Sequence, residues 1–278
     1  MLLDFQSQSN FWLQDSIQRG RSGVYAQMVR LTPVLASELL QRNPDNRSIQ
    51  VRRVEVYASD IISGRWAANG EPIILSKDGL LNDGQHRCAA VIQANMPIDC
   101  LIVFGIDRET RTTTNQGKAK GTSDYAAMYG IPNANNVAAM ARFAVAYYEI
   151  GSVETTKVSH SRALEYLNQN TESLLKSFRF IDRYRKKFAT LAPPSFMGFC
   201  HYVCANVNEL EADDYFYHLC SGEGLEAGDP ALVVRNRLMT IGRNRGAKIE
   251  VILRGWNHYR KGEQRSLIKV SGNIPMVS

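Results

Sequence analysis

The chain contains five consecutive residues whose types could bind a phosphate or take part in catalysis: Asp83-Gly84-Gln85-His86-Arg87. They follow a short apolar run and open a segment with helical spacing, so they are expected at the amino end of a helix. That end of a helix has unpaired N–H donors and a partial positive charge, glycine lets an anion approach, and arginine binds phosphate with two hydrogen bonds. The pattern predicts a phosphate-binding turn in which Gly84, Gln85, His86 and Arg87 contact a nucleotide.

Asp83 and His86 are the candidate catalytic residues of this turn. A carboxylate at this position is expected to bind Mg²⁺ or to accept a proton from an alcohol. An imidazole is expected to act as an acid or base, or to donate to a phosphoryl oxygen. The alternative is a purely structural turn, in which Asp83 caps the helix while His86 and Arg87 face solvent.

A polar stretch, Asn115 to Thr122, is the second candidate. Its glycines, lysines and amides are typical of a loop that closes over a nucleotide or contacts a DNA backbone. Asn115, Gln116 and Lys118 are the expected contacts. A basic loop without a ligand is the alternative.

Charge is concentrated near the carboxyl end. The net charge of the chain is +6, yet residues 235–269 contain ten basic and two acidic residues, a net charge of +8. Such a segment is typical of a nucleic-acid partner, because cations neutralise phosphates and release counterions. Trp256 within it is a candidate for stacking on a base. A solvated basic helix face is the alternative. The expected DNA-binding residues are Arg235, Arg237, Arg243, Arg245, Lys248, Arg254, Trp256, Arg260 and Lys261.

Length and composition limit the class of protein. The 278 residues, 44% hydrophobic and 22% charged, are typical of one large or two modest globular domains. No signal peptide and no long apolar span is evident, so a cytoplasmic protein without a membrane partner is expected. The five cysteines are scattered and are expected to be buried free thiols.

The elements that must position these residues are clear in the first half of the chain. The residues 25–31 predict a strand, and Thr32 followed by Pro33 predicts a helix through Leu40. A helix beginning near residue 48, strands at 72–76 and 79–82, a helix at 85–94 and a buried strand at 98–104 follow. Beyond residue 125 nearly all the patterns are helical.

These elements predict an α+β protein with two domains. Residues 1–24 are expected to form an arm or a short helix. Residues 25–122 are expected to form a small α/β nucleotide-binding domain, and residues 123–278 an all-helical domain with the basic segment at its end.

The run DGLLNDGQHRCAAVIQANMPIDCLIVFGID, residues 78–107, resembles the core of the ParB/sulfiredoxin superfamily. The upstream NPDNR, residues 43–47, is similar to the first basic box of that family, and this resemblance makes Arg47 a further phosphate contact. Together the similar residues span about 26–120. The resemblance implies nucleotide-dependent activity, with ATP or CTP and Mg²⁺ as cofactors.

Members of this superfamily differ in chemistry. Sulfiredoxins have a nucleophilic cysteine where this chain has Gln85, so reductase activity is not expected. Free-serine kinases have a motif that differs only at Gln85, and DGQHR-type regulators of DNA modification share all five residues. Partition ParB proteins have a Gly-Glu-Arg-Arg motif, from which this chain departs.

The wider pattern, including Gly64-Arg65-Trp66 and a terminal GWNHYRKGE, resembles ParB-like proteins of phages and prophages. The leading expectation is an ATP- and Mg²⁺-dependent kinase that acts on a hydroxyl group, such as a hydroxymethyl pyrimidine in DNA, inside a bacterial cell. The alternative is a nucleotide-responsive DNA-binding regulator without phosphoryl transfer, and a DNA nuclease ranks third. Whether the chain forms a homodimer is left open by the sequence.

Overall fold

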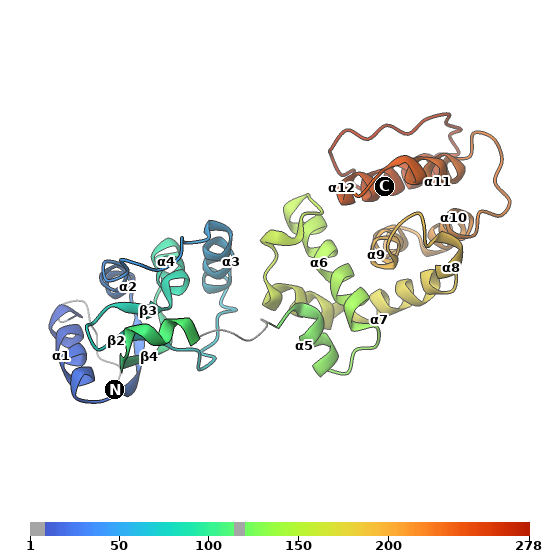
Figure 1. The fold of residues 1–278 in the computed structure, drawn as a ribbon. Helices are drawn as coiled ribbons and strands as arrows, with labels where there is room; N and C mark the ends of the chain where they lie inside the picture. The colour runs from blue at the N-terminus through green and yellow to red at the C-terminus, as the bar shows by residue number, and fades with distance from the viewer. Residues whose placement is uncertain (1–8, 114–119) are drawn as a thin grey trace. The chain divides into compact units, whose positions relative to one another are not determined.

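The computed structural model describes residues 9–113 and 120–278. The chain forms two compact units, residues 1–119 and residues 120–278 (Figure 1). The first contains a small mixed sheet with helices, and the described part of the second is helical. The α+β class is therefore confirmed at this level. The predicted domain boundary after residue 122 falls inside the first helix of the second unit, α5 (Thr122–Met128).

The sheet of the first unit places the predicted phosphate-binding turn at its edge. Its strand order is β1-β4-β2-β3, and β2 pairs parallel to β4 while β1 and β3 pair antiparallel to their neighbours. Strand β3 is one of the two edge strands and ends at Asp83, so the turn lies at that edge of the sheet. The strands are β1 (Tyr25–Leu31), β2 (Ile73–Ser76), β3 (Leu81–Asp83) and β4 (Ile98–Ile106).

Helix α4 (Gln85–Ala94) contacts both α2 (Pro33–Leu40) and α3 (Val51–Ile62) (Figure 1). Thr32 caps α2, because its hydroxyl accepts a hydrogen bond from Leu35 N at 3.2 Å. The strand and helix predicted at 25–31 and 33–40 are confirmed to the residue, as is the helix at 85–94. A 3₁₀ helix, η1 (Arg108–Thr113), follows β4.

The segment expected as an arm or short helix contains helix α1 (Ser9–Ser22). Leu13 and Ile17 are buried in the core of the first unit, and Trp12 packs edge-on against Phe104 of β4. This helix is therefore an integral part of the first unit.

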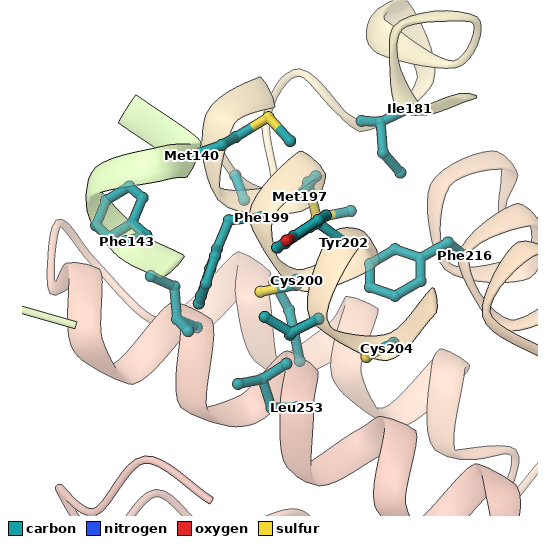
Figure 2. Packing of buried hydrophobic residues seen from close by; sticks show 14 of the residues in the cluster. Met140, Phe143, Ile181, Met197, Phe199, Cys200, Tyr202, Cys204, Phe216 and Leu253 are labelled. Carbon is teal, nitrogen blue, oxygen red and sulfur yellow. The ribbon is translucent and has the colours of Figure 1, made fainter. Parts of the chain in front are cut away.

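The second unit is built around α9 (Pro194–Ala205), in which residues 197–204 are all buried. Figure 2 shows Met197, Phe199, Cys200 and Cys204 of this helix among side chains from its neighbours. The other helices are α5, α6 (Ala134–Ile150), η2 (Thr155–Lys157), α7 (His160–Asp182), α8 (Arg185–Phe188), α10 (Glu209–Ser221), α11 (Pro230–Thr240) and α12 (Arg245–Arg260).

A buried carboxylate fastens the carboxyl-terminal segment to α12. Glu250 accepts hydrogen bonds from Ser271 N at 2.7 Å, from Gly272 N at 2.9 Å and from Arg254 Nε at 2.8 Å. The segment after α12 has no helix or strand among its residues, so such side-chain bonds hold it in place.

All five cysteines are free and buried, as predicted. In the part of the chain that the structure describes, no helix has the length and apolar character needed to span a bilayer.

Candidate functional site at the amino end of helix α4

Gly84 forms the turn between β3 and α4 in a conformation that favours glycine. Its φ is +110°, and a Cβ atom added there would lie 2.8 Å from Cγ1 of Ile73 on β2. Its carbonyl oxygen accepts hydrogen bonds from the N–H groups of Arg87 and Cys88, both at 3.0 Å. The space beside Gly84 was expected to admit an anion, but Ile73 fills it. The glycine therefore allows close packing of α4 on the sheet.

Gln85 holds residues 43–47 against the turn. Its side-chain nitrogen donates to the carbonyl oxygen of Arg47 at 2.8 Å, and its side-chain oxygen accepts from Asn43 Nδ2 at 2.9 Å. Asn46 adds a bond from its Nδ2 to Leu81 O at 2.7 Å. The residues 43–47 and 83–87, far apart in the sequence, thus form one site. Gln85 is buried, which makes it a positioning residue for the loop.

His86 was expected to donate to a phosphoryl oxygen, but the structure gives its ring another partner. Its Nε2 atom accepts a hydrogen bond from the backbone N–H of Gln50 at 3.0 Å, and the residue is only 7% exposed. Burial lowers the pKa of His86, and the positive charges of Arg53 and Arg47 lower it further. The imidazole is therefore a neutral acceptor that fixes the amino end of α3.

Arg87 was expected to bind phosphate with two hydrogen bonds. Its guanidinium instead donates to the carbonyl oxygens of Glu71 and Pro72, and its side chain is 11% exposed. It also lies 3.4 Å from Asp83 Oδ2. Arg87 thus anchors the segment that leads into β2, with both terminal nitrogens of its guanidinium engaged there.

Asp83 keeps more of its surface in solvent, since its side chain is 30% exposed. Among the described residues, no group of three or more His, Cys, Asp or Glu side chains could hold a metal ion. A Mg²⁺ ion commonly takes one or two protein carboxylates and completes its shell with phosphate and water. Asp83 fits that single role. The described residues contain no carboxylate cluster of the kind a nuclease would need.

The groups still available to a polyphosphate are backbone donors and two arginines. The N–H groups of Gln85 and His86 precede the first helical hydrogen bonds of α4. Arg47 and Arg53 are both exposed, and both are close enough to His86 to lower its pKa. These groups fit a phosphate ligand. Sequence reasoning missed Arg53, although its place in the first turn of the helix after Gln50 was a signal for it.

The second candidate loop, residues 115–122, is described from Lys120 onwards. Asn115, Gln116 and Lys118 lie outside the described residues.

The basic carboxyl-terminal segment is largely tied into its own unit. The side chains of Arg235, Lys248, Arg254 and Arg260 all bind acceptors there: Leu219 O, Leu191 O, Glu250 and Glu211 respectively. Arg237 contacts Thr240, whereas Arg243, Arg245 and Lys261 are exposed.

Trp256 is 0% exposed and packs against Tyr215 in the core. Its ring therefore has no free face for a base, and the structure assigns it to packing instead of nucleic-acid binding.

Comparison with protein-family models, curated proteins and solved structures finds no match to this chain.

Proposed function

We propose that the first unit is a nucleotide-responsive regulatory module that binds the phosphates of a nucleoside triphosphate at the amino end of α4. The observation that carries this proposal is the pair of exposed residues Arg47 and Arg53. Gln85 of α4 binds the carbonyl oxygen of Arg47, and Arg53 lies in the first turn of α3, whose capping residue Gln50 binds His86. The charges of the two arginines and the free backbone donors match the chemistry of a phosphate chain. The motif side chains Gln85, His86 and Arg87 are engaged in internal hydrogen bonds, which favours binding over catalysis.

The same residues also explain how nucleotide binding would change the structure of the first unit. When bound, the nucleotide brings negative charge and, with Mg²⁺, a divalent cation. Arg47 and Arg53 lie on the loop and helix that Gln85 and His86 hold. Phosphates contacting both arginines would therefore order residues 43–54.

Titration calorimetry of the full chain with Mg-ATP, Mg-CTP and Mg-GTP tests the proposal. The double variant Arg47→Ala/Arg53→Ala should bind the preferred nucleotide at least about tenfold more weakly, because charge-assisted bonds contribute about 1.5–3 kcal/mol each. Arg30→Ala is the matched control, since Arg30 lies on β1 at the other sheet edge and forms only an exposed pair with Asp99. No binding of any nucleotide, or equal loss in both variants, would reject the proposal.

Phosphoryl transfer to a hydroxyl is the second candidate, and the exposed part of Asp83 favours it. Asp83 would hold Mg²⁺ or take the proton of the acceptor alcohol. The test is incubation with γ-labelled ATP and Mg²⁺ against plain DNA, DNA containing hydroxymethyl pyrimidines, and free serine. Label on an acceptor that Asp83→Asn abolishes would establish a kinase. Nucleotide binding without label on any acceptor would reject the kinase and support the nucleotide-responsive regulator.

A further inference from the structure

Two segments of the second unit contain basic residues and no acidic ones. Residues 183–196 hold four Lys or Arg, and residues 243–249 hold three, with neither Asp nor Glu in either range. The first segment includes α8 and the turn into α9, and the second includes the first turn of α12. Only the second segment belongs to the basic stretch that the sequence singled out.

The fold brings these two segments together. Lys248 Nζ donates to the carbonyl oxygen of Leu191 at 2.5 Å. The guanidinium carbon of Arg245 lies 5.8 Å from the ring centroid of Phe196. These contacts join the first turn of α12 to the turn between α8 and α9, through Leu191, and to the first turn of α9, through Phe196. We call the surface formed by the basic residues of 183–187 and 243–248 the basic ridge.

Two of the seven cations of the basic ridge form ion pairs, Arg185 with Asp182 and Lys187 with Glu223. Arg183, Lys186 and Arg243 are exposed, and none of them forms an ion pair with any described residue. The second half of α12 differs, because Arg254 pairs with Glu250 and Arg260 pairs with Glu211. Acidic residues of this unit thus neutralise one end of α12 and leave the other end positive.

The kind of partner follows from what the basic ridge lacks. None of its residues, nor of the turn through Phe196, is an exposed large hydrophobic side chain. Protein interfaces are depleted in lysine and depend on buried apolar anchors, and membrane-surface helices insert apolar side chains. A nucleic-acid backbone needs only cations that can reach its phosphates.

We propose that the basic ridge binds the phosphate backbone of nucleic acid, with Arg183, Lys186 and Arg243 as contacts. This inference concerns the second unit and does not depend on nucleotide binding by the first.

Fluorescence anisotropy with the full chain and a labelled DNA duplex, repeated over a range of salt, tests this proposal. The variant Arg183→Ala/Lys186→Ala/Arg243→Ala should bind at least about tenfold more weakly, and the slope of log K against log salt should fall by about three. The matched control removes the same charge elsewhere in the second unit, as Lys120→Ala/Lys157→Ala/Lys176→Ala, and should bind within about twofold of wild type. Thermal unfolding of both triple variants checks that the fold is kept.

Each result bears on the proposal. A loss specific to the ridge variant supports it, and a parallel titration with duplex RNA identifies which nucleic acid is preferred. Equal loss in both variants, salt-independent affinity or no binding to either nucleic acid would overturn it. Binding of polyglutamate as tight as that of DNA would also overturn it, because any polyanion would then suffice.

Discussion

The Nε2 atom of His86 accepts a hydrogen bond from the backbone N–H of Gln50 at 3.0 Å, and this bond joins the amino ends of α4 and α3. Only a ring unprotonated at Nε2 can accept it, so the contact requires neutral His86. Burial, followed by the charges of Arg53 and Arg47, lowers the pKa of His86 below its ordinary value of 6.5 and so maintains the neutral form.

This bond should make the contact between α3 and α4 depend on pH. Because the folded pKa is lower than the unfolded pKa, the unfolded chain binds more protons as the pH falls. The stabilisation is thus complete above about pH 6.5 and is lost progressively as pH falls towards the folded pKa. Hydrogen exchange of residues 50–54, measured from pH 7.5 to 5.5 and corrected for intrinsic rates, should show opening at the acidic end.

His86→Gln is the matched variant, since its amide oxygen can accept the same bond without titrating. Opening of residues 50–54 should then lose its pH dependence. His218→Gln, in the second unit, serves as the control and should behave like wild type. An unchanged pH dependence in His86→Gln would contradict the role given to this ring.

Gly84→Ala should destabilise the first unit by about 2–4 kcal/mol, because it combines an unfavourable φ with a collision against Ile73. Gly64→Ala is the control, since Gly64 also has a positive φ of +71° but has nothing within 4 Å of an added Cβ. That variant should lose about 1 kcal/mol. Chemical denaturation of both variants makes the comparison, and equal losses would show that the packing against Ile73 is unimportant.

Glu250→Gln should loosen the carboxyl-terminal segment. Burial alone would raise the pKa of Glu250, but the hydrogen bonds from Ser271, Arg254 and Gly272 together lower it. The contribution of the carboxylate is therefore present above the unfolded pKa near 4.5 and is lost as pH falls. At pH 7 the substitution should cost about 2–3 kcal/mol.

Limited proteolysis should then cut residues 264–278 faster in Glu250→Gln than in wild type. The exposed Glu226→Gln is the control and should be cut at the wild-type rate. Equal cutting in all three proteins would mean that Glu250 does not hold the segment.

Trp256→Leu separates packing from base stacking. Removing the buried indole should cost about 3 kcal/mol of stability, since a large side chain is lost from the core. Nucleic-acid affinity, measured by anisotropy at a temperature where the variant is folded, should match that of wild type. A loss of affinity in the folded variant would restore Trp256 as a stacking residue.

The sequence alone predicted the elements that local signals define. Thr32 with Pro33 marks the start of α2, and the run YAQMVRL before it fits a strand, so both elements were located to the residue. For residues 1–24 the sequence left an arm or a short helix open, because the apolar pattern there is weak, and the structure shows helix α1. Its place depends on a long-range contact, the approach of Gly20 to Gly105 of β4.

For the candidate site, the sequence determined which residues lie at a helix amino end, and the resemblance to a known superfamily pointed to residues 43–47 as well. Tertiary structure decided where their side chains point. Gln85, His86 and Arg87 turn towards the carbonyl and N–H groups of Arg47, Gln50 and Pro72, partners that no spacing along the chain reveals. Likewise, the composition located a stretch rich in lysine and arginine. Only the fold decides which of these side chains form ion pairs with acidic residues, because such pairs join residues that are far apart in the sequence. Arg260 pairs with Glu211 in this way, whereas Arg243 is exposed and forms no ion pair with any described residue.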